Sequence, residues 1–153
     1  MDIAYTRQDK IFNPITQRFR IIVFGVGSVG SFVTLNLAKL GFNDITVYDF
    51  DVVEKENVPN QFYRLQDCGK FKVDALKEMV KDFADVEIKT NNTIVNEKTE
   101  IPQDLNCLYI LTFDSLAARK MIYDKLRGMN NYLLDCRMGG EEFSIYTSKM
   151  NDD

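Results

Sequence analysis

The stretch RIIVFGVGSVG, residues 20–30, decides the fold of this chain. It opens with a β-branched and aromatic run of the kind that forms a strand buried on both faces. The glycine pattern GVGSVG follows at once, and apolar residues then recur at close to helical spacing through residues 31–40. Gly41 is suited to the turn that ends such a helix. With ITVYD, 45–49, as the next strand, the first fifty residues predict one βαβ unit.

Strands and helices keep alternating in the rest of the chain. Helices are predicted at 71–83 and near 115–127, and strands at 86–90, 107–111, 131–136 and 143–147. The alternation predicts an α/β fold, a Rossmann-like, mostly parallel and doubly wound sheet with helices on both faces. The apolar residues that carry the helical spacing are Val29, Phe32, Val33, Leu37, Leu40, Leu76, Met79, Val80, Phe83, Leu116, Ala117, Met121 and Ile122.

Length and charge are those of an ordinary globular domain. The chain has 153 residues, and we expect a nucleotide-binding domain over 20–150, preceded by a peripheral arm or helix over 1–19. The net charge is -4 and Lys and Arg are scattered, so we expect no nucleic-acid partner. No apolar run approaches the roughly 18 residues of a membrane helix, and the amino terminus has no signal-peptide stretch. We therefore expect no membrane partner and a cytoplasmic location.

The complete absence of histidine restricts the chemistry. His-dependent triads and HExxH metal sites are excluded, so any reaction must use carboxylates, Lys, Arg, amides and a metal held by oxygen. The three cysteines are widely spaced and form neither a disulfide framework nor a CxxC pair, so we expect no zinc. Cys107 and Cys136 lie in apolar strands and are expected in the core, whereas Cys68 is expected to be exposed.

The GVGSVG loop predicts a nucleotide site. Gly25 allows the tight turn, Gly27 lets the backbone approach phosphate, and Gly30 lets the helix pack closely on the strand. The helix start also offers N–H groups to an anion. Asp49, at the end of the second strand, could accept hydrogen bonds from ribose or could be a solvated strand-end carboxylate. Asp51 is interpreted as a structural residue that turns the chain or caps the short segment that follows it. The loop alone leaves three readings open: a nicotinamide or flavin dinucleotide, ATP, or helix packing without a ligand.

Four motifs in order then indicate a family. They are GVGSVG (25–30), YDFDVVEKENVPNQF (48–62), GKFK (69–72) and TFDS (112–115). Their order and spacing resemble the ThiF, MoeB and ubiquitin-activating E1 family of ATP-dependent adenylyltransferases. In addition, YTRQ, 5–8, is similar to that family's Tyr-x-Arg-Gln arm, and RMGGEEFSIYT, 137–147, is similar to its Arg-Met-x-Gly strand. The resemblance covers nearly the whole chain.

The resemblance implies ATP and Mg²⁺ as ligands. It places Gly25, Gly27, Gly30, Asp49, Asn60 and Gln61 around the nucleotide, and it makes Arg7, Asn57, Lys72 and Asp114 catalytic. Asn57 would contact the phosphates, Lys72 would neutralise their charge, and Asp114 would bind Mg²⁺, which prefers oxygen ligands. Arg7 would cross a two-fold axis into the partner subunit's site, which implies a homodimer.

Each of these roles has a structural alternative. Lys72 could be an exposed lysine at a helix start, and Asp114 could be the N-cap of the helix that follows it. Arg7 could be a solvated charge on the arm. Arg119 is a reserve cation, which we expect to pair on a helix face.

The chain also departs from the family pattern. Asn60 stands where most of the family has a phosphate-contacting Arg, and Arg64, four residues on, is the candidate to bind phosphate in its place. The family's zinc-binding CxxC pairs and its crossover-loop cysteine are absent. The family fold continues beyond the strand at 143–147, so we expect either a fragment of a longer protein or a minimal version.

The function expected from the resemblance is ATP- and Mg²⁺-dependent adenylation of a C-terminal carboxylate. The substrate would be a ubiquitin-like or sulfur-carrier protein ending in Gly-Gly, and the product an acyl-adenylate. Asn57, Asn60 and Gln61 would form a polar wall around the phosphates and the incoming carboxylate. Two alternatives stay open. One is an NAD-dependent oxidoreductase, which Asp49 fits. The other is a catalytically inactive E1-like partner subunit, which the neutral Asn60 favours.

Overall fold

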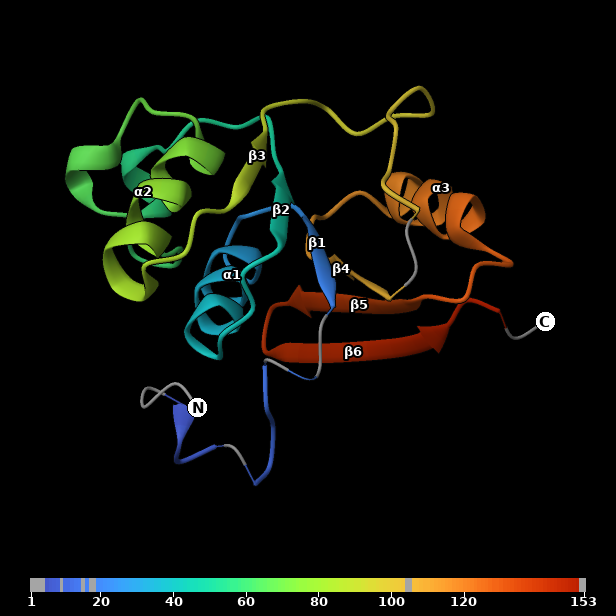
Figure 1. Ribbon diagram of the computed structural model, residues 1–153. Helices are drawn as coiled ribbons and strands as arrows, with labels where there is room; N and C mark the ends of the chain where they lie inside the picture. The colour runs from blue at the N-terminus through green and yellow to red at the C-terminus, as the bar shows by residue number, and fades with distance from the viewer. Residues whose placement is uncertain (1–4, 9, 15, 17–18, 104–105, 152–153) are drawn as a thin grey trace.

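The computed structural model describes residues 5–8, 10–14, 16, 19–103 and 106–151, which form a six-stranded sheet with helices packed on it (Figure 1). The elements are β1 (Arg20–Phe24), α1 (Gly30–Lys39), β2 (Ile45–Tyr48), α2 (Lys72–Ala84), β3 (Lys89–Asn91), β4 (Cys107–Leu111), α3 (Leu116–Leu126), β5 (Tyr132–Gly139) and β6 (Glu142–Lys149). Two short 3-10 turns, Lys55–Asn57 and Leu65–Asp67, lie between β2 and α2. β1 and β4 begin and end at the predicted residues.

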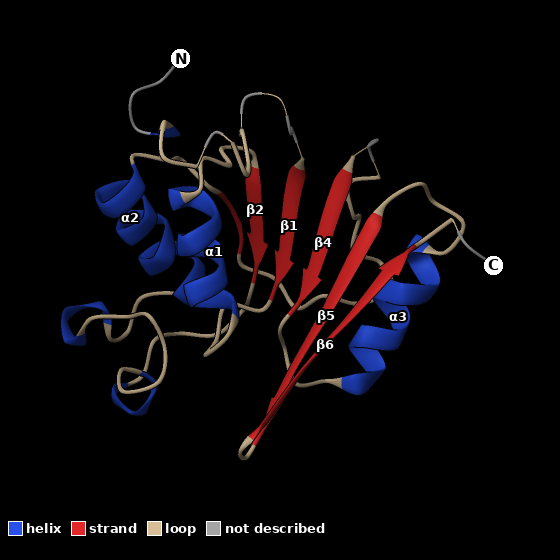
Figure 2. Cartoon of the chain, turned by 90° about the horizontal axis from the view of Figure 1, so that it is seen from below, coloured by secondary structure: helices blue, strands red, loops and turns tan. Residues whose placement is uncertain are grey.

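The strand order is β3-β2-β1-β4-β5-β6. Neighbouring strands pair in parallel, except that β6 pairs antiparallel with β5 at one edge. Figure 2 shows α1 and α2 on one face of the sheet and α3 on the other. The predicted Rossmann-like, doubly wound, mostly parallel α/β fold is therefore confirmed. The direction of winding reverses between β1 and β4, which defines the switch point of the sheet.

Burial on both faces explains the unbroken apolar run of β1. Ile21 and Val23 pack in the cluster that lies under α1 and α2, whereas Ile22 and Phe24 pack in the cluster on the α3 side. Successive side chains of a strand point to opposite faces. A strand between two helical layers therefore has no position that faces solvent.

The face that α1 buries differs from the apolar stripe in its sequence. Ser31 and Thr34 are buried, whereas Phe32 is exposed. Small residues on the inner face let the helix approach the sheet closely, and the two hydroxyls donate to the carbonyl oxygens of Gly27 and Gly30. Of the apolar residues with helical spacing, Val33 and Leu37 are partly buried against the core, so the spacing of this helix marks its packed face only in part.

The other two helices follow their apolar spacing only in part. Met79 and Val80 of α2 are buried, as is Ile122 of α3. Phe83 and Leu116, however, are 57% and 67% exposed. Both exposed residues lie in the terminal turn of their helix, which periodicity cannot distinguish from the middle turns.

Gly41 lies in the turn that ends helix α1, as predicted. The φ angle of Gly41 is +104°, and the N–H groups of Gly41 and Phe42 donate back to the last turn in a Schellman motif. The amino-terminal segment packs on this end of α1: a Cβ on Gly41 would lie 2.6 Å from Pro14 Cγ, and Gln8 Nε2 donates to the Leu40 oxygen at 2.8 Å. The described part of the predicted arm therefore lies one helix length, about 15 Å, from the glycine loop.

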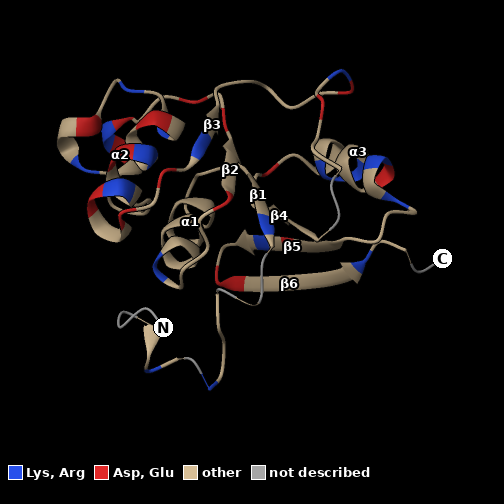
Figure 3. Cartoon of the chain, in the orientation of Figure 1, with Lys and Arg blue, Asp and Glu red and all other residues tan. Residues whose placement is uncertain are grey.

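Charge and cysteine placement complete the description. Basic and acidic residues stand side by side on α2 (Figure 3). Cys107 and Cys136 are buried, as predicted, whereas Cys68 is half-buried against the core rather than exposed. Within the described ranges no helix is both long and apolar enough to cross a membrane.

Candidate functional site

A cavity of about 430 Å³ lies at the carboxyl ends of β1, β2 and β4. This is the switch point of the sheet, where ligands bind in open α/β folds. The sequence-predicted residues that line it are Gly25, Gly27, Asp49, Gln61, Lys72 and Asp114. The predicted residues outside its lining are Arg7, Gly30, Asn57, Asn60 and Arg64. The fold thus brings together residues from four separate motifs and leaves five candidates elsewhere.

The glycine loop forms one wall of the cavity. Gly25 has a φ of +88°, and a Cβ there would lie 2.9 Å from Phe113 Cβ, so a larger residue would be strained. At Gly27 the nearest atom to an added Cβ is Gln61 Nε2 at 4.0 Å, so this glycine leaves its surroundings open to a ligand. A Cβ on Gly30 would overlap the carbonyl oxygen of Gly25. Gly30 therefore serves the close packing of α1 and does not line the cavity.

Asp49 ties the glycine loop to the end of β2. Its Oδ2 accepts a hydrogen bond from the Val26 N–H at 2.8 Å, and its Oδ1 accepts one from the Asp51 N–H at 2.9 Å. The alternative of a simply solvated carboxylate is therefore wrong. Each carboxylate oxygen can accept a further hydrogen bond, which is the capacity that a ribose hydroxyl would use.

The chain between the two 3-10 turns clamps the glycine loop, a feature that the sequence analysis missed. Tyr63 is buried, and its hydroxyl donates to the Val26 oxygen at 2.7 Å. Ser31 Oγ donates to the Gly27 oxygen at 2.6 Å and accepts from the Phe62 N–H at 3.0 Å. Burial, with a smaller effect of nearby carboxylates, raises the pKa of Tyr63 far above its usual value, so the hydroxyl stays a donor. A tyrosine directly after the Gln-Phe pair is the signal that could have found this clamp.

Gln61 presents a buried polar atom that lacks a partner. Its Oε1 has no hydrogen bond within the described part of the chain. Nearly all buried polar side-chain atoms in proteins are paired, with protein groups or with water. The orphaned oxygen of this side chain, which lines the cavity, therefore points to a polar ligand or a bound water there.

Lys72 begins α2 and is buried, so the alternative of an exposed lysine is wrong. Its Nζ lies 2.9 Å from Asp51 Oδ2, and its backbone N–H donates to the backbone carbonyl oxygen of Asp51 at 2.8 Å. Asp51, interpreted from the sequence as a residue that turns the chain, lines the cavity and pairs with the lysine. Two hydrogen bonds between the same two residues join the end of β2 to the start of α2.

Asp114 lies just after β4 and is exposed at the cavity. It is not the N-cap of α3. That position belongs to Ser115, whose side chain accepts from the Ala118 N–H at 3.2 Å. In the described ranges no hydrogen bond or ion pair reaches the Asp114 carboxylate, so it is free to coordinate a ligand.

Arg119 supports the loop that carries Asp114. Its guanidinium stacks on the Phe113 ring at 5.6 Å, donates to the Cys136 oxygen at 3.0 Å and forms a buried ion pair with Asp135. The expected pairing on a helix face is therefore wrong, because the partners lie on β5. A buried guanidinium needs a carboxylate, and β5 supplies it.

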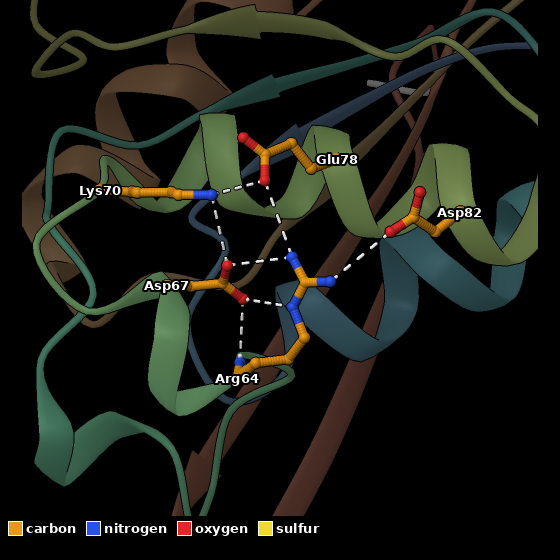
Figure 4. Close-up of polar contacts among 5 residues, drawn as sticks. All are labelled: Arg64, Asp67, Lys70, Glu78 and Asp82. Atoms are coloured by element: carbon orange, nitrogen blue, oxygen red, sulfur yellow. Dashed lines mark hydrogen bonds and ion pairs between the residues drawn. The ribbon is translucent and has the colours of Figure 1, made fainter.

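Arg64, which we expected to bind phosphate, lies outside the cavity. Figure 4 shows it inside an ion-pair cluster, in which its Nε lies 2.9 Å from Asp67 Oδ2 and its terminal nitrogens reach Glu78 and Asp82 at 3.7 and 3.5 Å. Lys70 joins the cluster through Glu78 at 2.6 Å. Burial opposes ionisation of Asp67, but the hydrogen bonds and charge of Arg64 outweigh it and hold the pKa of Asp67 below its usual value. This cluster fastens the second 3-10 turn to α2, so Arg64 does not compensate for Asn60.

The expected polar wall is reduced to Gln61. Asn57 closes the first 3-10 turn, where its Oδ1 accepts from the Glu54 N–H at 3.0 Å. Asn60 is exposed, and neither asparagine lines the cavity. Asn side chains commonly satisfy backbone groups in turns, and here that local use takes Asn57 out of the wall.

Arg7 is exposed and belongs to the amino-terminal segment at the far end of α1. It does not line the cavity of its own chain. Among the described residues near it, Tyr5 has a 3-10 conformation and residues 6–8 form turns.

The lining of the cavity is acidic. It contains the three carboxylates of Asp49, Asp51 and Asp114 and the single ammonium of Lys72, a net charge of -2. No group of three or more Cys, Asp or Glu side chains that could hold a metal is found in the part of the chain that the structure describes.

Comparison with known proteins matches residues 3–135 to the model of the ThiF family. Among curated proteins, the chain is 34% identical over 116 residues to the NEDD8-activating enzyme E1 catalytic subunit of Arabidopsis thaliana, covering 74% of this chain and 25% of that protein. It is 27% identical over 125 residues to the SUMO-activating enzyme subunit uba-2 of Caenorhabditis elegans, covering 79% and 22%. The chain thus spans about a quarter of the length of these relatives.

Solved structures share the fold. The structure of PaaA superposes with a TM-score of 0.76 at 22% identity, over 93% of this chain and 49% of that one. The structure of E. coli MccB with ATP superposes with a TM-score of 0.75 at 17% identity, over 90% of this chain and 45% of that one.

Proposed function

This chain belongs to the ThiF family, and from that premise we propose that it is the nucleotide-binding part of an ATP-dependent adenylyltransferase. The substrate would be the C-terminal carboxylate of a ubiquitin-like or sulfur-carrier protein that ends in Gly-Gly. Relatives named as enzymes that activate NEDD8 or SUMO support this class of substrate. A solved neighbour that holds ATP supports the choice of nucleotide.

The adenylation reaction requires the protein to bind and orient the reactants, without a protein nucleophile. A carboxylate oxygen attacks the α-phosphorus of ATP, the bond from that phosphorus to the bridging oxygen breaks, and pyrophosphate leaves with the bonding electrons. No protein nucleophile takes part, so the enzyme has to align the reactants and stabilise charge. Amides, backbone N–H groups and an ammonium can do this in a chain without histidine.

The observation that carries the proposal is that Gly27, with open space beside it, and the buried Lys72 ammonium line one cavity. Polyphosphate needs a backbone it can approach and a cation that is shielded from water, since charge interactions strengthen in a low dielectric. The unpartnered amide oxygen of Gln61 adds a neutral hydrogen-bond acceptor. Asp49, in the same lining, would hold the ribose.

Asp114 is the residue that would hold Mg²⁺. A cavity with a net charge of -2 repels phosphates, so a cation is needed for ATP to bind well. Mg²⁺ usually takes one or two carboxylates together with phosphate oxygens, which suits one exposed carboxylate at the cavity edge. When bound, the ion would neutralise phosphate charge.

The active form would be a homodimer that Arg7 completes. This arginine lies outside the cavity of its own chain, which is the placement that an arm serving a partner subunit requires. It would bring to the site a second cation, which the lining of the cavity does not contain.

A catalytically inactive E1-like partner subunit is the second candidate. The observation in its favour is that Lys72 is the single cation in the cavity lining, because Asn60 is neutral and exposed and Arg64 is bound to acidic residues elsewhere. Such a subunit would keep the fold and the nucleotide cavity but would not release pyrophosphate.

Calorimetric titration of ATP and of NAD⁺, each with and without Mg²⁺, tests the choice of ligand. We expect ATP binding that strengthens with Mg²⁺ and no preference for NAD⁺. A preference for NAD⁺ would support the oxidoreductase alternative and refute the proposal. Exchange of labelled pyrophosphate into ATP, measured with candidate Gly-Gly carrier proteins, then separates the active enzyme from the inactive partner.

A further inference from the structure

The ion pair between Lys72 and Asp51 is the feature of the cavity that the proposed reaction does not yet use. The lysine side chain is 8% exposed, whereas the aspartate side chain is 48% exposed. A buried ammonium is stable only with a counter-ion close to it. In the described part of the chain, Asp51 is the carboxylate within ion-pair distance of Lys72.

The unequal burial decides which partner can leave. Lys72 starts α2 with its backbone N–H bound to the Asp51 carbonyl oxygen at 2.8 Å, and its side chain is enclosed by the protein, so the ammonium has little room to move. The Asp51 carboxylate lies near solvent, and turning it towards water costs little because half of it is already hydrated. An anion that enters the cavity can therefore take the place of Asp51 beside the ammonium.

We propose that Asp51 is a positioning residue that holds Lys72 in the nucleotide-free protein and gives it up to phosphate when the nucleotide binds. The proposal rests on the proposed function in so far as the anion is a polyphosphate. Binding is then an exchange at the ammonium, from carboxylate to phosphate. Until the exchange occurs, Asp51 competes with phosphate for the lysine and adds its own repulsion in an already acidic cavity.

This exchange has a consequence for the role of metal. A Mg²⁺ ion on the phosphates would reduce the repulsion from Asp51, whereas metal-free nucleotide would meet it in full. Asp51 should therefore make the affinity for ATP depend more steeply on Mg²⁺. A residue with a purely structural role would change affinity with and without metal to the same extent.

The test compares Asp51→Asn with Asp74→Asn by calorimetry, with ATP and with pyrophosphate as separate probes, each in EDTA and in Mg²⁺. Asp74 is exposed in the first turn of α2 and does not line the cavity, so its replacement makes the same charge change as a control. In EDTA we expect Asp51→Asn to bind both probes about tenfold more tightly than the unchanged protein. In Mg²⁺ the gain should fall to about threefold or less. Asp74→Asn should stay within about twofold throughout.

A double-mutant cycle with Lys72→Met separates exchange from simple repulsion. If phosphate competes with Asp51 for the ammonium, the gain from Asp51→Asn in EDTA should drop to about twofold once the lysine is absent. An undiminished gain would overturn the exchange. Should Asp51→Asn fail to fold, as judged by circular dichroism, Asp51→Ser would replace it.

The outcomes distinguish this inference from the proposed function. ATP binding by the unchanged protein, with no gain or a loss in Asp51→Asn, would refute the exchange and leave the proposed function standing. Pyrophosphate binding that tightens in Asp51→Asn, without any ATP binding, would support the exchange and refute the proposed function. Binding of neither probe by any variant would overturn both.

Discussion

The clamp that Tyr63 places on the glycine loop can be removed by taking away one atom. Tyr63→Phe deletes the hydroxyl that donates to the Val26 oxygen at 2.7 Å and keeps the buried ring. The Val26 oxygen loses a donor inside the protein, and an unsatisfied buried carbonyl costs about 1–3 kcal/mol. In a chain of this size about 1.5 kcal/mol lowers Tm by roughly 3–6 °C.

The same loss should weaken the nucleotide site. Val26 lies between Gly25 and Gly27 and also donates to Asp49, so a loosened Val26 disturbs both the backbone that we propose faces phosphate and the carboxylate that we propose holds ribose. If the lost free energy reappears as the cost of ordering the loop around ATP, the dissociation constant should rise about tenfold. Calorimetry with ATP and Mg²⁺ measures this, and thermal unfolding measures the stability.

Tyr109→Phe is the matched control. Tyr109 is also buried, and its hydroxyl donates to the Pro102 oxygen at 2.5 Å, but it does not line the cavity. We expect this variant to lose a similar amount of stability and to keep its affinity for ATP. If Tyr63→Phe binds ATP as tightly as the unchanged protein, or if both variants weaken binding equally, the clamp has no role in the site.

Three further predictions address the metal, the arm and the acid stability. Asp114→Ala should abolish the gain in ATP affinity that Mg²⁺ gives, and it should leave Tm within about 1 °C because the side chain is exposed. ATP titrations with and without Mg²⁺ measure this gain, and its survival in the variant would refute the metal assignment. Arg7→Ala should bind ATP with unchanged affinity, but its rate of pyrophosphate exchange should fall about tenfold or more, because the variant lacks a charge that would stabilise the transition state. If analytical ultracentrifugation shows that the unchanged protein is a monomer with full exchange activity, an arm that acts across a dimer is ruled out. The pKa of Asp67 is lowered in the folded chain from 3.8, so its contribution to stability is present above that value and is lost as the pH falls through the folded pKa. Urea unfolding between about pH 5 and 2 should therefore show a smaller loss of stability in Asp67→Asn than in the unchanged protein, and parallel curves would contradict the role of the cluster.

Local pattern was enough to predict the elements and their order. The run at 20–24, the glycines that follow it and the strand at 107–111 are short-range features, since a strand buried on both faces must be apolar throughout. Gly25 and Gly41 could be interpreted in the same way, because a positive φ is a property of one residue and its immediate neighbours. The order of the motifs indicated the family, and the match over residues 3–135 agrees with it.

Side-chain partnerships between distant segments were decided by the tertiary structure alone. Arg64 and Lys72 are both cations near acidic residues in the sequence, yet Arg64 is bound in the cluster that joins the second 3-10 turn to α2, and Lys72 is buried in the cavity with Asp51. The partners of Tyr63 and Arg119 lie 37 and 16 residues away, on separate segments. The pair of Arg64 with Asp67 spans three residues and is local, whereas the partners of Tyr63 and Arg119 depend on how distant segments pack, which the spacing of residues along the chain does not record.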